Sequence, residues 1–226
     1  MIDWSRIDTV FLDMDGTLLD LGFDNYFWRE LVPRRYAEAR GLSVLDAQAR
    51  VTARYQTQEG ALTWYCLDYW SAELELDLIA LKREVASAIT AMPNAEAFLQ
   101  ALQALPVRVV LVTNAHPASL SLKMDRTGLD RFFAAQVSSH ELGEPKESPV
   151  FWTRLREVEP FLPHRSVLID DSLAVLQSAR RQGIGQTIAI RRPDLKQPPR
   201  QIDEFTAVDD LRDVMPDGAS GPHLFI

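Results

Sequence analysis

Short runs of aliphatic and β-branched residues recur along the chain, and each run is closed by polar residues. Mostly apolar runs of this length are typical of strands buried on both faces of a parallel sheet. The predicted strands cover Thr9 to Leu12, Val107 to Val112, Ala135 to Ser138, Val167 to Ile169 and Thr187 to Ile190.

The segments between these strands have helical patterns of apolar residues. Helices are predicted over Ala95 to Leu105, Pro117 to Thr127, Pro149 to Glu157 and Leu173 to Gln182. Because strands and helices alternate, we expect an α/β fold built on a doubly wound parallel sheet.

The long gap between the first two strands has no strand pattern and is rich in Ala, Leu, Glu and Arg at helical spacing. It predicts a helical domain, residues 21–92, inserted into a core domain of residues 1–20 and 93–226. Within it, Pro33 is expected to start a helix after Leu31 and Gly41 to end it. Pro93 and Asn94 are expected to form the turn that returns to the core.

Composition narrows the classes of partner. The chain has 226 residues, 46% hydrophobic, which is enough for a core and a small accessory domain. The excess of 32 Asp and Glu over 24 Lys and Arg, without a long basic run, speaks against a nucleic-acid partner. No secretory signal is visible at the start, and no apolar run approaches the roughly 20 residues that span a bilayer. A cytoplasmic protein with no membrane partner is expected, in an oligomeric state that the sequence leaves open.

Three further features of the chain have no part in the expected chemistry. Cys66 has no partner for a disulfide and is interpreted as a packed thiol within a helix, in a reducing compartment. Arg191, Arg192, Lys196 and Arg200 follow the last predicted strand and are interpreted as a solvated loop. In the Gly- and Pro-rich tail, Leu224 to Ile226 could dock on the body of the protein.

The candidate catalytic and binding residues are those where the predicted strands end, because ligands of open parallel sheets bind at the carboxyl ends of the strands. The polar residues at these ends, with one lysine in the loop after the third strand, are Asp13, Asp15, Thr113, Asn114, Lys146, Asp170 and Asp171. His116 is the histidine expected near this edge of the sheet, as a loop residue.

The four carboxylates of this set repel one another and would repel a phosphate. Each unit-charge pair at ~4 Å costs about 1 to 4 kcal/mol, depending on the local dielectric. A divalent cation on the carboxylates and the charge of Lys146 bring the sum close to neutral if Asp15 is protonated. Mg²⁺ is the expected cofactor because no His or Cys accompanies the oxygen ligands.

With that charge offset, Asp13 can act as a nucleophile on phosphorus. Asp15, two residues further on, can stand beside the leaving oxygen and act first as general acid and then as general base. This role needs a raised pKa, which like charges nearby would cause. Thr113 is expected to donate a hydrogen bond to the phosphoryl group, and Lys146 to stabilise its developing charge.

The segments DMDGTLLD, LVTNAH, GEPKESPVFW and LIDDS, in this order, resemble the four motifs of the haloacid dehalogenase superfamily. The resemblance implies a Rossmann-like core and a Mg²⁺-dependent hydrolase that forms an aspartyl-phosphate. It also implies metal ligation by the Asp13 carboxylate, the Asp15 carbonyl and Asp171, with Asp170 bound directly or through water. One departure is Val175, where many members have a carboxylate or an amide.

Two aromatic segments of the insertion, LDLGFDNYFW and LTWYCLDYWS, resemble the bacterial GMP/IMP 5′-nucleotidases of this superfamily. The resemblance implies a helical cap over a purine nucleoside monophosphate, with an aromatic ring stacked on the base. Asn25, Arg34 and Arg54 are candidate contacts of the leaving group, and Thr113, Asn114 and Lys146 of the phosphate.

Other functions remain open at this point. A phosphatase or a phosphomutase acting on a sugar phosphate or phosphoglycolate would use the same aspartates. Asp15 speaks against carbon–halogen hydrolysis, because an alkoxide leaving group needs a proton and a halide does not. A signalling receiver domain also combines acidic residues with a Thr and a Lys, but there the Lys comes last, whereas Lys146 precedes Asp170. An interaction protein that has lost catalysis would not need the complete acidic set.

Overall fold

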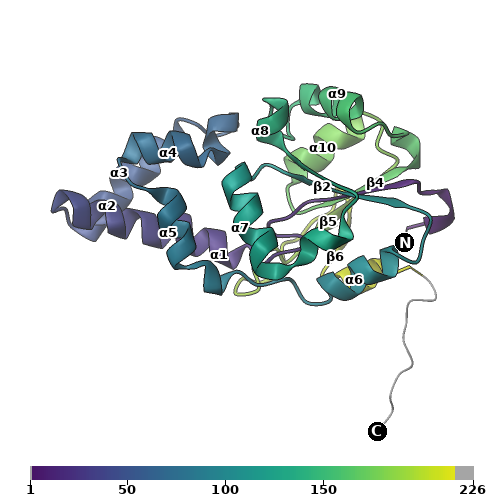
Figure 1. The fold of residues 1–226 in the computed structure, drawn as a ribbon, viewed down its shortest axis with the longest axis horizontal. Coiled ribbons are helices and arrows are strands. Elements are labelled where there is room, and N and C mark those ends of the chain that lie inside the picture. The colour runs from purple at the N-terminus through teal and green to yellow at the C-terminus, as the bar shows by residue number, and fades with distance from the viewer. Residues whose placement is uncertain (1, 217–226) are drawn as a thin grey trace, which may run out of the picture.

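The computed structural model describes residues 2–216 of the chain and contains the predicted doubly wound α/β sheet (Figure 1). All its strands are parallel, in the order β3-β2-β1-β4-β5-β6. The strands are β1 (Thr9–Leu12), β2 (Arg108–Thr113), β3 (Ala135–Ser138), β4 (Ser166–Asp170), β5 (Gln186–Ile190) and β6 (Thr206–Val208). The short edge strand β6 was not predicted, because three residues carry too little pattern to be recognised.

Helices cover both faces of this sheet (Figure 1). Side chains alternate along the central strand, so Val10 and Leu12 belong to one hydrophobic cluster and Phe11 to the other. The first cluster is covered by α6 (Ala95–Leu102) and α7 (Pro117–Thr127). The second is covered by α8 (Ser139–Leu142), α9 (Pro149–Val158) and α10 (Leu173–Arg181).

Residues 22–84 form helices that stand beside the sheet, at its carboxyl end (Figure 1). They are α1 (Gly22–Tyr26), a π-helical turn (Phe27–Leu31), α2 (Val32–Arg40), α3 (Val44–Gln56), α4 (Leu67–Leu74) and α5 (Leu78–Glu84), with a 3₁₀ turn at Leu62–Tyr65. These helices have a hydrophobic cluster of their own, which includes Phe27, Val51 and Trp70. We call this segment the insertion.

Of the helix ends and turns predicted in and around the insertion, those at Gly41 and Asn94 are confirmed and the helix start at Pro33 is not. Gly41 ends α2 in the left-handed conformation, and Asn94 adopts the same conformation before α6. Pro33 does not start a helix, since α1, the π-helical turn and α2 continue without a break and Leu31 has helical dihedral angles. Pro33 has no N–H to donate within this continuous helix, and the π-helical turn directly precedes α2, which is where such an irregularity is expected.

Two chain segments join the insertion to the sheet, and they run side by side. The Asp20 N–H donates to Thr90 O at 3.0 Å, and the Met92 N–H donates to Leu18 O at 2.8 Å. The entry and the exit of the insertion are therefore hydrogen-bonded to each other. This pairing supports 20/21 and 92/93 as the boundaries of an inserted domain, which we retain as a proposal.

The expectations for Cys66, the C-terminal segment and membrane-spanning helices have different outcomes. Cys66 does not lie inside a helix: it precedes α4 as its N-cap, and its sulfur accepts a hydrogen bond from the Tyr69 N–H. The segment from Leu224 to Ile226 falls outside the described residues. Within residues 2–216, no helix combines the length and the apolar character needed to cross a membrane.

Candidate active site

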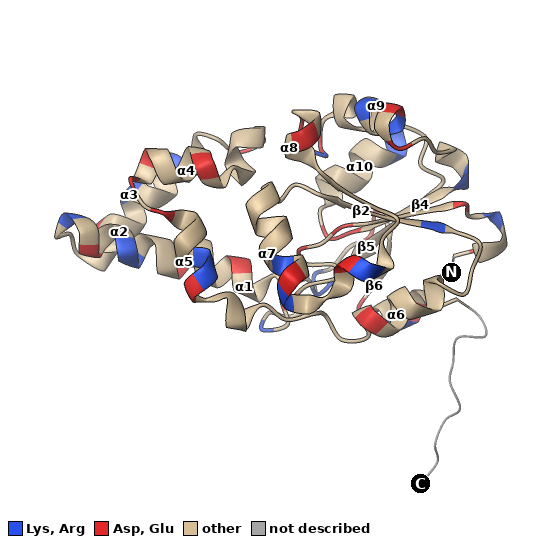
Figure 2. Ribbon diagram, viewed as in Figure 1, with Lys and Arg blue, Asp and Glu red and all other residues tan. Residues whose placement is uncertain are grey.

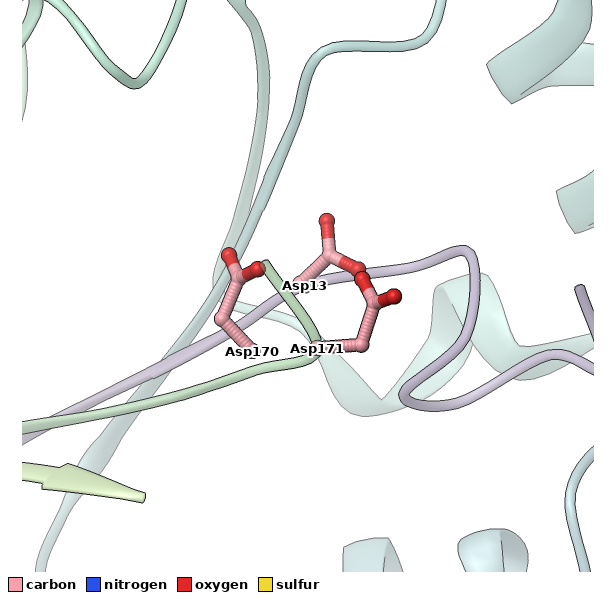
Figure 3. Close-up of side chains that lie close together, drawn as sticks. All are labelled: Asp13, Asp170 and Asp171. Carbon is pink, nitrogen blue, oxygen red and sulfur yellow. The ribbon is translucent and has the colours of Figure 1, made fainter. Parts of the chain in front are cut away.

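Asp13, Asp170 and Asp171 form an acidic cluster at the carboxyl ends of β1 and β4 (Figure 3). The two strands are parallel neighbours with Leu12 opposite Ile169, so the residues that follow, Asp13 and Asp170, are brought side by side. One carboxylate oxygen from each of the three aspartates lies within 4.8 Å of the others. The sheet register therefore creates this cluster.

Lys146 lies beneath the acidic cluster and is 2% exposed. Its Nζ donates to Asp13 Oδ1 at 2.5 Å, to Asp170 Oδ2 at 2.7 Å and to Val112 O at 3.1 Å. Burial alone would lower the pKa of this lysine, but the two carboxylates outweigh burial and raise the pKa above its usual range. Lys146 is therefore a permanent positive charge in the cluster.

The surrounding protein groups raise the pKa values of the carboxylates in the cluster. Burial, and secondarily the charge of Asp170, raise the pKa of Asp13 to about 6 although Lys146 opposes this shift. The pKa of Asp171 is raised well above its usual value, again chiefly by burial. Three aspartates and one lysine leave two negative charges when ionised. A compact, all-oxygen, dianionic set fits a hard divalent cation such as Mg²⁺.

A tight turn after β1 brings the Asp171 loop close to the backbone. Gly16 has φ +88°, and a Cβ at this position would lie 2.8 Å from Asp171 Cγ and 2.8 Å from Pro193 Cβ. Arg200 holds the same loop from outside, because its Nη2 donates to Asp171 O at 2.6 Å and to Ile190 O at 2.7 Å. Arg200 is exposed and lies in a loop, as expected for the basic segment, and it also holds the Asp171 loop through these two hydrogen bonds.

Polar groups after β2 line the other side of the cluster. The Thr113 Oγ1 accepts a hydrogen bond from the Ala115 N–H at 3.0 Å, which leaves its hydroxyl proton free to donate. Asn114 Oδ1 accepts from the Lys146 N–H at 2.9 Å, and Asn114 Nδ2 donates to Glu147 Oε2 at 2.9 Å. The loops that carry Asn114 and Lys146 are thus fastened to each other.

Glu147 also connects the sheet to the insertion. The hydroxyl of Tyr65 donates to Glu147 Oε1 at 2.7 Å. Burial and the charge of Glu147 raise the pKa of Tyr65, so its phenol remains a donor. Nearby, His116 Nε2 lies 3.3 Å from Asp68 Oδ2, a second polar contact between the insertion and a core loop. We call these contacts of Tyr65 and Asp68 the seam.

Asp15 has a different environment from the acidic cluster. Its Oδ1 accepts a hydrogen bond from Lys123 Nζ at 2.6 Å, and the same Nζ donates to Asp24 Oδ2 at 2.5 Å. Lys82 Nζ donates to Asp24 Oδ1 at 2.7 Å and to Ser119 Oγ at 3.0 Å. The result is a chain of alternating charges, Asp15, Lys123, Asp24 and Lys82, which we call the ionic chain.

The ionic chain changes which interactions set the pKa of Asp15. Burial is the largest cause of its shift and raises the pKa of Asp15 to about 6, with Lys123 opposing and Asp24 adding to the rise. Burial also acts on Asp24, but Lys123 and Lys82 outweigh it and hold the pKa of Asp24 well below its usual range. The raised pKa expected for Asp15 is present, with burial rather than like charges as the main cause.

A cavity of about 600 Å³ lies between the acidic cluster and the insertion. Asp13, Asp15, Thr113 and Lys146 line it on the side of the sheet, and the insertion contributes aromatic and amide side chains among others. The aromatic lining includes Trp28, Tyr55, Trp64 and Tyr65. Trp28 and Tyr55 pack edge to face, with ring centroids 5.7 Å apart.

The candidate leaving-group contacts are distributed unevenly around this cavity. Asn25 lines it, while its Nδ2 donates to Asp194 Oδ2 at 2.8 Å. Arg34 and Arg54 do not line it: Arg34 is exposed beside Tyr26, and Arg54 donates to the Tyr36 hydroxyl at 2.9 Å. The structure therefore does not bring these two arginines to the site.

Several site residues were missed by sequence reasoning. Glu147 follows Lys146 directly, and Lys123 stands between Leu120 and Met124 on the inward face of α7. A charged residue on an apolar helix face is a signal that could have identified Lys123. The pairing of Lys82 with Asp24 has no counterpart in the sequence pattern. Val175, the noted departure, lies in α10, packs in the second hydrophobic cluster and also lines the cavity.

The parallel sheet, the helical insertion after β1 and the carboxylates at adjacent strand ends define a class of α/β protein with a ligand site between the sheet and an inserted domain. Comparison with known proteins identifies the family. Residues 7–183 match the haloacid dehalogenase-like hydrolases, and the chain belongs to this family of enzymes. The signalling receiver domain is thereby excluded.

Individual relatives agree with this assignment. The chain is 38% identical, over 95% of its length and 97% of the relative's, to a protein of Escherichia coli (strain K12) named GMP/IMP nucleotidase YrfG. A solved HAD phosphatase from Thermococcus onnurineus has a TM-score of 0.77 at 19% identity, covering 92% of this chain and 96% of that one. The HAD-hydrolase YfnB from Bacillus subtilis, described as bound to magnesium and showing interdomain movement, has a TM-score of 0.60 at 20% identity, covering 92% and 97%. At these identities, the two structures speak for the fold alone.

Proposed function

We propose that this enzyme hydrolyses phosphate monoesters through an aspartyl-phosphate on Asp13. The observation that carries the proposal is the pairing of two aspartates in different environments. Asp13 lies in the acidic cluster beside Lys146, and Asp15 lies apart from it, facing the cavity with its own counter-ion. One carboxylate is thus suited to attack phosphorus and the other to serve the leaving oxygen.

In the first step, an oxygen of Asp13 bonds to phosphorus while the bond from phosphorus to the ester oxygen breaks. The ester oxygen takes the proton of Asp15 and leaves as an alcohol. In the second step, Asp15 takes a proton from water as the water oxygen bonds to phosphorus. The bond between Asp13 and phosphorus then breaks, which releases inorganic phosphate.

Neighbouring groups favour the phosphoryl group in this arrangement. Lys146, held by Asp13 and Asp170, provides a fixed positive charge, and the free hydroxyl proton of Thr113 can donate to a phosphoryl oxygen. Mg²⁺ held by Asp13, Asp170 and Asp171, with the Asp15 carbonyl, would neutralise the two remaining charges and orient the phosphoryl group. Both carboxylate oxygens of Asp170 already accept a hydrogen bond, Oδ2 from Lys146 Nζ and Oδ1 from the Ser172 N–H. Asp170 can therefore bind the cation only through a remaining lone pair of one of these oxygens.

Replacement of the nucleophile tests the reaction. Asp13→Asn should abolish Mg²⁺-dependent release of phosphate from p-nitrophenyl phosphate, with an unchanged circular dichroism spectrum. Asp130→Asn, at an exposed position outside the cavity, is the matched control and should retain activity. Undiminished turnover by Asp13→Asn would refute the proposed reaction.

We further propose that the substrate is a purine nucleoside 5′-monophosphate. The cavity volume of about 600 Å³ lies within the range of ligand sites of roughly 300–1,000 Å³. Trp28, Tyr55 and Trp64 offer ring faces or edges to a base, and Gln48 and Gln56 offer amide donors and acceptors along its rim. The name of the Escherichia coli relative points to the same substrates.

A panel of phosphate esters tests the substrate. IMP and GMP should have the highest kcat/KM in a set that includes pyrimidine nucleotides, sugar phosphates and phosphoglycolate. A preference for a sugar phosphate or phosphoglycolate would remove the purine proposal and leave the phosphatase proposal intact. Phosphorus NMR of the products separates hydrolysis from a phosphomutase reaction, since only hydrolysis accumulates inorganic phosphate.

A further inference from the structure

The ionic chain is buried to a degree that stability does not explain. Lys123 is 1% exposed and Lys82 is 3% exposed. Buried ion pairs cost desolvation energy, and apolar residues of similar size in their place are often neutral or stabilising. Lys123 lies between Leu120 and Met124, where an apolar side chain would continue the packed face of α7. A charged residue in such a place calls for a role other than packing.

The hydrogen bonds of the ionic chain leave one oxygen free, and it belongs to Asp15. Both oxygens of Asp24 are occupied, Oδ1 by Lys82 and Oδ2 by Lys123. Asp15 Oδ1 is held by Lys123, whereas its Oδ2 accepts no hydrogen bond from any of residues 2–216. Asp15 also lines the cavity. The ionic chain thus presents a single unoccupied carboxylate oxygen, Asp15 Oδ2, to a ligand.

Fixing this carboxylate matters because Asp15 stands only two residues from Asp13. An unrestrained Asp15 side chain could turn toward Lys146 or toward a cation at the acidic cluster. A general acid acts only within about 2.6–3.2 Å of the oxygen that it protonates, so a rotated carboxylate would lose its function. Lys123 opposes that rotation from the far side, and Asp24 holds Lys123 in place.

We propose that Lys123 and Asp24 are positioning residues that hold Asp15 at the leaving-group side of the cavity. Lys82 of α5 extends this arrangement into the insertion, because its ammonium binds the second oxygen of Asp24 and lies 5.0 Å from the Phe27 ring centroid. The acid is therefore placed only when α1, α5 and α7 are packed together. This inference rests on the proposed phosphatase function.

The test exploits the leaving group. An alkyl phosphate such as IMP releases an alcohol that needs the proton of Asp15, whereas p-nitrophenyl phosphate releases a phenolate that is stable near neutral pH. The kinetic constant to compare is kcat/KM, because it covers the steps up to release of the leaving group and excludes the shared hydrolysis of the aspartyl-phosphate. Lys123→Met should lower kcat/KM for the alkyl ester at least about tenfold more than for the aryl ester, within the range of general acid catalysis.

Two further variants separate positioning from stability. The double variant Lys123→Met with Asp24→Asn removes one charge of each sign, so it remains informative if the single variant fails to fold, and it should have the same selective loss. Arg108→Met removes a remote ion pair with Glu159 at the opposite end of β2, and should change both esters equally or not at all.

The outcomes are distinct. A selective loss on the alkyl ester supports the inference. Equal losses on both esters in folded variants, or no loss, overturn it while the phosphatase function stands. If the wild-type enzyme releases phosphate from neither ester, the proposed function fails, and this inference fails with it. If IMP is a poor substrate, the best alkyl phosphate of the panel replaces it and the comparison is unchanged.

Discussion

At the residue scale, a single glycine determines how closely two loops of the candidate active site can approach. Gly16 follows Asp15, and its φ of +88° is a conformation that side chains with a Cβ rarely adopt. The space where a Cβ would stand is already occupied by the Asp171 carboxylate and Pro193. The acidic cluster therefore depends on this position as well as on its own carboxylates.

Gly16→Ala should destabilise the protein by about 1–3 kcal/mol through backbone strain and should also displace Asp171. Denaturant unfolding measures the first effect, and a Mg²⁺ titration of phosphate release measures the second, with a higher requirement for Mg²⁺ expected. Gly41→Ala is the control, because Gly41 also has positive φ, +60°, but nothing lies within 4 Å of its added Cβ. It should lose stability with unchanged Mg²⁺ dependence. Equal Mg²⁺ dependence in the two variants would contradict the steric argument.

At the element scale, the seam joins Tyr65 in the turn before α4 and Asp68 in α4 to the loops after β2 and α8. Tyr65 reaches Glu147, and Glu147 in turn holds Asn114, whose amide oxygen binds the backbone of Lys146. The insertion is therefore hydrogen-bonded to the same loops that carry the candidate phosphate contacts Asn114 and Lys146. We infer that the seam favours the arrangement in which the insertion covers the cavity.

Tyr65→Phe should raise KM for the preferred ester up to about tenfold, because a hydrogen bond to a charged group contributes about 1.5–3 kcal/mol and part of it is replaced by water. Steady-state kinetics with the full-length protein measure the change. Tyr69→Phe is the matched control, since the Tyr69 hydroxyl makes no hydrogen bond within residues 2–216 and lies outside the cavity lining. Identical kinetics of the two variants would show that the seam has no part in binding.

At the scale of the whole molecule, the outer helices carry charges of both signs, whereas the acidic cluster carries charges of one sign. Lys and Arg are interspersed with Asp and Glu over the outer helices (Figure 2), whereas the acidic cluster concentrates negative charge at the sheet edge. This concentration destabilises the folded protein once the carboxylates ionise. A cation bound by these three aspartates would therefore link its binding to folding.

The linkage predicts how Mg²⁺ stabilisation depends on pH. The pKa of Asp13 is raised to about 6 in the folded state, from about 3.9 in an unfolded chain. Without a cation, its contribution to stability therefore declines as pH rises from about 4 to above 6. Mg²⁺ requires the ionised carboxylates, so it should raise Tm more at about pH 7.5 than at about pH 5.

Differential scanning calorimetry with and without Mg²⁺ at the two pH values measures this difference. Asp171→Asn should reduce the effect at the higher pH, because it removes one oxygen ligand and one charge from the cluster. A Tm increase of the same size at both pH values would contradict linkage through these carboxylates.

The sequence by itself determined the sheet and the candidate reacting groups. The apolar runs fixed where β1, β2 and β4 lie, and the polar residues that close those runs had to meet because parallel strands end at one edge. Asp13 and Asp171 could be predicted because they stand where β1 and β4 end, and the position of each strand is a local property of the chain. Lys146 lies farther from its strand, in the loop between α8 and α9.

Only the tertiary structure decided which groups surround these residues. Lys123 meets Asp15 across 108 positions of the chain, and Tyr65 meets Glu147 across 82. Such contacts depend on how the insertion packs against α7 and the loops, and no local periodicity records that packing. For the same reason, the sequence suggested Arg34 and Arg54 as contacts, whereas folding directs both away from the cavity and brings Lys82 and Asp24 to it.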